Sequence, residues 1–148
     1  TLVANGVRLR ILGNLKAFPQ RVAAQIDKAL EKTSQGRKML LNIALAYGAR
    51  DEIMQAVRKV CAKVLAQGIK PEEIDSELFE SCLYTAGIPD PDLIIRTSGE
   101  ERLSNFLLYQ AAYSELYFTD VAWPDFTPEH FDAALAEYKS RVRRFGGI

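Results

Sequence analysis

Two arginines and a serine lie close together within the sequence DLIIRTSGEERLSNFLLYQAAYSE, residues 92–115. The apolar run at residues 93–95 is typical of a buried strand, and Arg96 follows it directly. Arg102 and Ser104 come a few residues later. The fork of an arginine guanidinium matches phosphate oxygens at two points, and a serine hydroxyl adds a further donor. This spacing predicts an anion site at the carboxyl end of a strand.

A second interpretation of the same residues stays open. The two arginines could instead pair with Glu100 and Glu101, while Ser104 only caps a helix expected over residues 105–114. If that helix forms, the free backbone amides of its first turn add donors to the anion site. The stretch 105–114 is apolar almost all round, which predicts that it is buried or forms an interface.

Glu115 is a carboxylate with apolar sequence on both sides. It follows the apolar stretch 105–114 and precedes Leu116-Tyr117-Phe118. A carboxylate in such surroundings is costly unless it pairs with an arginine or binds a cation. Magnesium, which takes oxygen ligands and bridges protein carboxylates to substrate phosphates, is one suitable partner. A structural ion pair is the other, and it is the more common.

Strand-like and helix-like segments alternate three times along the chain, which predicts the fold class. The connections are long enough for right-handed crossovers, so we expect an α/β fold with layered helices around a mainly parallel β-sheet. Ligands in such folds bind beyond the carboxyl ends of the strands. The expected strands are residues 7–13, 39–47 and 93–95, and the expected helices are residues 19–33, 50–67, 105–114, one opened by Pro71 and one from Pro128 onward.

The composition narrows the class of protein. A length of 148 residues suits about one domain, so we expect a single α/β domain over residues 1–148. Nineteen acidic and nineteen basic residues leave no net charge, which argues against a nucleic-acid partner. There is neither a membrane-spanning apolar run nor a signal-peptide layout, so we expect a cytoplasmic protein. Cys61 and Cys82 match no metal-ligand spacing and are expected to be buried reduced thiols.

The longest motif, DLIIRTSGEERLSNFLLYQAAYSELYF, resembles the C-terminal signature of the cis-prenyltransferases, the undecaprenyl diphosphate synthase family. LNIALAYGARDEI resembles a more central motif of that family, and VRLRILG and VAWPDFTPEHFDAALAEYKSRVRRFGG also fit. The resemblance implies a transferase of isoprenoid biosynthesis with Mg²⁺ as cofactor. Such an enzyme transfers prenyl groups from an allylic diphosphate, such as farnesyl diphosphate, to isopentenyl diphosphate. The prenyl product grows with Z stereochemistry into a long undecaprenyl-type diphosphate, which is the precursor of a cell wall lipid carrier.

The resemblance also implies roles for individual residues. Arg96, Arg102 and Ser104 match the family's catalytic positions, and together with Leu103 they match its binding site for isopentenyl diphosphate. Glu115 matches the glutamate that serves the metal. The physical interpretation agrees, since two guanidinium forks and a hydroxyl suit a diphosphate and a carboxylate suits Mg²⁺.

A homodimer follows from the resemblance as well. Arg144 and Gly146 match an Arg-x-Gly element that binds substrate by reaching across the dimer toward the neighbouring active site. The apolar stretch 105–114 lies in the region that the family uses for dimer contact. Peripheral membrane contact during product release is a further expectation.

The sequence departs from the family at its beginning. The Met-Asp-Gly-Asn-Gly-Arg-Trp type motif, which supplies an essential aspartate and binds the allylic diphosphate, is absent. We therefore expect the C-terminal part of a longer catalytic domain, starting before Thr1, and we expect the 148 residues alone to be inactive. Ala49 stands where a second glycine is usual, and Tyr109 where tryptophan is usual. Two alternatives are a short-chain Z-prenyl diphosphate synthase and a non-catalytic partner subunit. The latter is disfavoured by the retained residues Arg96, Arg102, Ser104 and Glu115.

Overall fold

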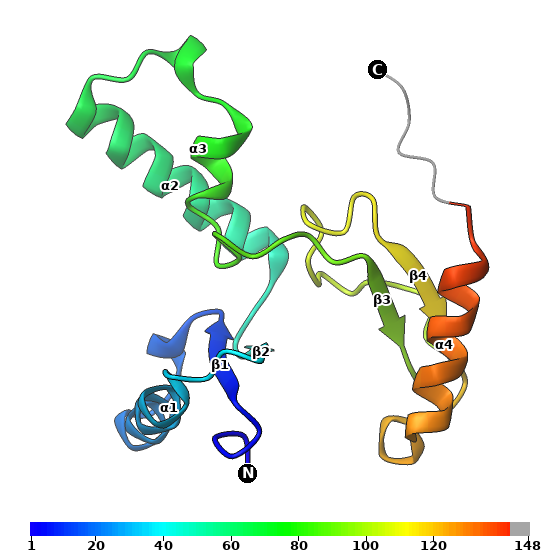
Figure 1. Ribbon diagram of the computed structural model, residues 1–148. Coiled ribbons are helices and arrows are strands. Elements are labelled where there is room, and N and C mark those ends of the chain that lie inside the picture. The colour runs from blue at the N-terminus through cyan, green and yellow to red at the C-terminus, as the bar shows by residue number, and fades with distance from the viewer. Residues whose placement is uncertain (143–148) are drawn as a thin grey trace. The chain divides into compact units, whose positions relative to one another are not determined.

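Two parallel strand pairs form the β-structure of the chain in the computed structural model, which describes residues 1–142 (Figure 1). The chain divides into two compact units, Thr1–Gly87 and Ile88–Ile148. Each unit combines one strand pair with helices, which confirms the predicted α/β class with parallel strands. Within the described residues, no helix is both long enough and apolar enough to span a membrane.

The first unit is built on β1 (Val7–Leu12) and β2 (Met39–Ala44), which run parallel with Val7 opposite Met39 and Leu12 opposite Ala44. The helix α1 (Gln20–Thr33) packs against β1. Thr33 is buried at the end of α1, where its hydroxyl donates to the Ala29 carbonyl at 2.8 Å and accepts from the Leu9 amide at 3.2 Å. This hydroxyl therefore joins the last turn of α1 to the strand.

The helix α2 (Ala49–Gln67) follows β2 and packs with the short helix α3 (Ser76–Glu80). Gly68 ends α2 with φ 69°, a left-handed conformation that glycine adopts without steric cost. Ala56 and Val60 of α2 are buried, as is Leu83, which follows α3. The remaining short elements of this unit are the 3₁₀ turns η1 (Leu15–Ala17) and η2 (Pro71–Glu73).

The second unit pairs β3 (Leu93–Arg96) with β4 (Glu115–Phe118), again in parallel. After the 3₁₀ turn η3 (Trp123–Asp125), the helix α4 (Pro128–Ser140) packs along β4 (Figure 1). Proline at the first helical position and a capping box between Thr127 and His130 define its start, as the dipeptide Thr127-Pro128 predicts.

Three sequence-based expectations about local structure are wrong. Residues 105–114 form turns instead of a helix, because Asn105 and Leu107 have φ values of 64° and 47°, which a right-handed helix excludes. The helix opened by Pro71 is broken into η2 and the five-residue α3. Cys82 is buried as expected, but Cys61 is exposed because it lies on the outer face of α2.

Candidate functional site

The turn after β3 carries the candidate anion-binding residues of the second unit. Arg96 is the last residue of β3, opposite Phe118 of β4, and its carbonyl accepts from the Thr119 amide at 3.0 Å. The Ser98 amide donates to the Val121 carbonyl at 2.9 Å, and the Gly99 amide donates to the Thr119 carbonyl at 2.9 Å. These bonds hold the turn against the segment that follows β4, at the carboxyl end of the strand pair as predicted.

Gly99 allows this turn to form. Its φ is +67°, and a Cβ atom at this position would lie 3.0 Å from Oδ1 of Asp120. Gly99 and Asp120 also line a hollow of about 300 Å³ together with Glu101, Phe118 and Thr119. Two carboxylates face this hollow, so its own lining favours cations over anions.

Arg102 and Ser104 follow in the same loop. The Arg102 guanidinium is largely exposed and forms an ion pair with Glu100, as the second interpretation of the sequence anticipated. Ser104 has a φ of 48°, and the Leu103 carbonyl accepts from the Phe106 amide at 3.0 Å. Because no helix begins at Asn105, the free amides of a helix N-terminus do not contribute to this site.

Glu115 lies at the opposite end of the strand pair from Arg96. It begins β4 opposite Leu93, whereas Arg96 is opposite Phe118 at the other end of the same register. At a rise of roughly 3.3 Å per residue, this offset separates the two positions by about 10 Å along the strands. The structure therefore brings Arg96, Arg102, Leu103 and Ser104 into one loop region but places Glu115 away from it.

An arginine is the observed partner of Glu115. Nη1 of Arg141 donates to Oε2 of Glu115 and to the Leu116 carbonyl, both at 2.9 Å. Nη2 of Arg141 donates to Oε1 of Glu137 at 2.5 Å. The hydrogen bonds to Glu137 and to Glu115 raise the pKa of Arg141 above its usual range. Of the two partners that the sequence suggests for Glu115, the structure contains the ion pair.

The described residues contribute little to a metal site on their own. Within residues 1–142, no three His, Cys, Asp or Glu side chains gather closely enough to hold a metal ion. Glu115 offers one carboxylate, of which only Oε2 has a hydrogen bond among these residues. A carboxylate oxygen suits Mg²⁺, which commonly takes one or two protein carboxylates and completes its shell with phosphates and water. Glu115 therefore fits as one ligand among several.

Neither Arg141 nor the buried Glu52 stands out in the sequence as a functional residue. Arg141 belongs to a run of basic residues that the helix C-terminus already explains, although its i, i+4 spacing from Glu137 signals a pair. Glu52 accepts from the Tyr47 hydroxyl at 2.5 Å and from the Tyr84 amide at 2.8 Å, which anchors the start of α2. No local pattern distinguishes Glu52 from its exposed neighbour Asp51.

Arg144 and Gly146 lie outside the residues that the structure describes. Their predicted role therefore stays a prediction.

Comparisons with known proteins place these motifs in a family. The profile of the family described as "Putative undecaprenyl diphosphate synthase" matches residues 1–146. Proteins named isoprenyl transferase are similar over nearly the whole chain. Those of Geobacillus kaustophilus (strain HTA426) and Bacillus subtilis (strain 168) are 49% and 50% identical over 147 residues, which is 99% of this chain and 57% and 56% of theirs. The chain thus spans somewhat more than half the length of these relatives.

Solved structures agree with the sequence matches. One similar structure is a crystal structure of lavandulyl diphosphate synthase from Lavandula x intermedia in complex with dimethylallyl diphosphate. It superposes with a TM-score of 0.91 at 38% sequence identity, and the match covers 95% of this chain and 61% of that protein's chain. A structure described as a probable undecaprenyl diphosphate synthase from Campylobacter jejuni has a TM-score of 0.82 and 34% identity, with coverage of 97% and 65%. The chain belongs to the undecaprenyl diphosphate synthase family, the cis-prenyltransferases.

Proposed function

We propose that the protein carrying this chain transfers prenyl groups from an allylic diphosphate to isopentenyl diphosphate with Z stereochemistry and builds a long, undecaprenyl-type diphosphate. The observation that carries this proposal is the family match over residues 1–146, which includes the whole loop from Arg96 to Ser104. The 49–50% identity to isoprenyl transferases over nearly the entire chain supports it.

In this proposal, Arg96, Arg102 and Ser104 hold the diphosphate of isopentenyl diphosphate, with Leu103 in the same loop. The Arg102 side chain retains 66% of its exposed surface, so its ion pair with Glu100 is a weak surface pair. A diphosphate, with more charge and more oxygens than one carboxylate, can replace Glu100 as the partner. Catalysis then depends on positioning the substrate and stabilising the departing diphosphate.

We further propose that Glu115 contributes one oxygen ligand to a Mg²⁺ ion that accompanies the substrate diphosphate. When bound, the ion would neutralise charge on the phosphate oxygens. Support comes from the carboxylate itself, whose Oε2 is held by Arg141 while Oε1 has no hydrogen bond within residues 1–142. The ion would complete its shell with substrate oxygens and water.

The remaining proposals concern the assembly and its place in the cell. A homodimer would use Arg144 and Gly146 from one subunit near the site of the other. The apolar turns at residues 105–114, with Phe106 and Leu108 partly exposed, suit a dimer contact. We place the protein in the cytoplasm, with peripheral membrane contact for release of an apolar product, and without a nucleic-acid partner because the chain has no net charge.

Two alternatives differ in chemistry. The similarity to lavandulyl diphosphate synthase favours a short-chain product as the second candidate. A non-catalytic partner subunit is the third, and the retained loop residues Arg96, Arg102 and Ser104 speak against it. Incubating the complete protein with farnesyl diphosphate and labelled isopentenyl diphosphate, followed by chromatography of the products, separates long-chain, short-chain and inactive outcomes.

Replacing Arg102 tests the proposed site. In the complete protein, Arg102→Ala should raise the KM for isopentenyl diphosphate and lower kcat, because a charge-assisted hydrogen bond of roughly 1.5–3 kcal/mol is lost. That energy corresponds to a loss of about 10- to 160-fold in kcat/KM. Arg58→Ala removes another exposed arginine, from α2, and serves as the control. Wild-type kinetics in Arg102→Ala would contradict the proposal.

A further inference from the structure

Arg141 connects the end of α4 to the start of β4 through three hydrogen bonds. Its Nη1 donates to the Glu115 carboxylate and to the adjacent Leu116 carbonyl, while its Nη2 donates to Glu137 one helical turn away. Glu115 begins β4 and Glu137 lies in α4, 22 residues later in the sequence. One guanidinium thus gathers two carboxylates from different elements.

Arg141 lies at the end of α4, and its guanidinium is partly buried there. It is the C-cap residue at which α4 ends and the backbone becomes extended, with φ −80° and ψ 141°. Its side chain and that of Glu115 keep only 29% and 26% of their exposed surface. Because partly buried pairs are less screened by water and salt than surface pairs, this contact constrains the Glu115 carboxylate more than an exposed pair would.

The geometry restrains one edge of the carboxylate and leaves the other open. Nη1 contacts Oε2 of Glu115 and also the backbone of the next residue, so the carboxylate is oriented relative to the strand itself. Among the described residues, Oε1 has no hydrogen bond. Two carboxylates share one guanidinium, so the cluster of Arg141, Glu115 and Glu137 keeps a net charge of about −1 and still attracts a cation.

We propose that Arg141 is a positioning residue that orients Glu115 for its cation. This inference rests on the proposed function, in which Glu115 supplies an oxygen to Mg²⁺. In this proposal, Arg141 acts through Glu115 and not on the substrate or the ion directly. It holds Oε2 so that Oε1 is presented in one direction, which lowers the entropic cost of binding the ion.

The test compares Arg141→Met, Arg141→Lys and the control Lys139→Met in the complete protein. Lys139 is an exposed base in the last turn of the same helix, so its loss removes the same helix-terminal charge without touching Glu115. Arg141→Met should raise the Mg²⁺ concentration for half-maximal activity by about 10-fold, in the range typical for loss of a group that orients a metal ligand. In Arg141→Lys, this Mg²⁺ concentration should lie between those of the wild type and Arg141→Met, because one ammonium group cannot reproduce the contacts of the guanidinium fork.

A second readout does not depend on turnover. Mn²⁺ binding in the presence of isopentenyl diphosphate, followed by electron paramagnetic resonance, should weaken by a similar factor in Arg141→Met and stay unchanged in Lys139→Met. The melting temperature of each variant shows how much the Arg141 contacts contribute to the stability of the fold, apart from cation binding. If Arg141→Met fails to fold, Arg141→Lys carries the comparison.

The outcomes separate this inference from the proposed function. If Glu115→Gln shifts the Mg²⁺ requirement while both Arg141 variants change only the melting temperature, the positioning role is wrong and the function stands. A lower Mg²⁺ requirement in Arg141→Met would show that the arginine competes with the ion, which also overturns the inference. If Glu115→Gln leaves the Mg²⁺ and Mn²⁺ titrations unchanged, the metal role of Glu115 fails and the positioning role fails with it.

Discussion

Gly99 holds a backbone conformation that other residues adopt only at a cost. Its φ of +67° lies in the left-handed region, and the carboxylate of Asp120 occupies the space beside it. The neighbouring Ser98, with φ 68°, and Ser104, with φ 48°, show that the loop accepts such conformations at residues that disfavour them. Non-glycine residues with positive φ concentrate at functional sites, which agrees with the proposed role of this loop.

Replacing Gly99 with alanine should lower the free energy of unfolding of the second unit by more than the cost of the left-handed backbone conformation alone. Left-handed backbone costs an L-residue roughly 1–2 kcal/mol, and at Gly99 the new Cβ would also press on Asp120. Gly68→Ala is the matched control, because Gly68 has φ +69° with no atom within 4 Å of the added Cβ. Urea unfolding of both variants measures the difference. Equal losses of stability would show that the contact with Asp120 has no effect.

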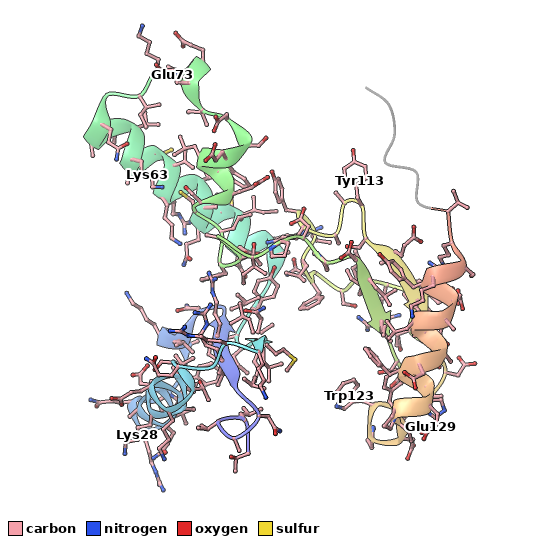
Figure 2. All side chains as sticks on the ribbon, in the orientation of Figure 1. Lys28, Lys63, Glu73, Tyr113, Trp123 and Glu129 are labelled. Atoms are coloured by element: carbon pink, nitrogen blue, oxygen red, sulfur yellow. The ribbon has the colours of Figure 1, made fainter. Side chains whose placement is uncertain are left out.

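At the scale of elements, α4 supports the position of Glu115 in the proposed site. Its side packs on β4, and its last turn leads to Arg141, which holds Glu115. The start of α4 is fixed separately: Nδ1 of His130 accepts from the Thr127 amide at 3.1 Å, and Glu129 lies in the first turn (Figure 2).

The first turn of α4 should lose stability in acid. A hydrogen bond from Thr127, and then the local backbone, lowers the pKa of Glu129 below its ordinary value of 4.5. A lowered pKa in the folded state contributes stability above the ordinary pKa, and this contribution disappears as the pH falls through the folded-state pKa. The stability difference between wild type and Glu129→Gln should therefore be present at neutral pH and vanish in acid.

Chemical unfolding across acidic pH values measures this difference. Asp132→Asn, which changes another exposed acid of α4, is the control. A difference between wild type and Glu129→Gln that is independent of pH would contradict the assignment to this carboxylate.

At the scale of the whole molecule, large apolar side chains remain exposed in both units. Met39 on β2, Leu65 on α2 and Trp123 at η3 keep 52%, 86% and 72% of their surface. Single exposed apolar residues are common in proteins, and these three contribute little to the core of either unit.

Trp123 provides a direct measurement, because it is the single tryptophan of the sequence. It stacks on Phe126 at 6.1 Å between ring centres but otherwise faces solvent (Figure 2). In the 148-residue chain, we expect red-shifted emission and quenching by acrylamide nearly as efficient as for free tryptophan. Blue-shifted emission with weak quenching would contradict the exposed position. Trp123→Phe supplies the background signal.

Sequence patterns predicted the local structure where one segment decides its own conformation. Alternating apolar and basic residues located β1, a nearly continuous apolar run located β2, and Gly68 located the end of α2. The same reasoning failed at residues 105–114, where a dense apolar stretch was interpreted as a helix. Apolar density reports that side chains are buried or in an interface, but the left-handed φ values of Asn105 and Leu107 depend on packing around the loop.

The sequence by itself determined the family, the α/β class, and the location of Arg96, Arg102 and Ser104 at and beyond the carboxyl end of a strand, because local motifs and periodicity carry that information. Only the tertiary structure decided the partner of Glu115 and the distance of Glu115 from those residues along the strands. Its partner, Arg141, is 26 residues away in the sequence. No periodic pattern shows which two charged side chains come into contact when the ends of a segment of that length are brought together. The parallel register of β3 and β4 places Glu115 at one end of the strand pair and Arg96 at the other.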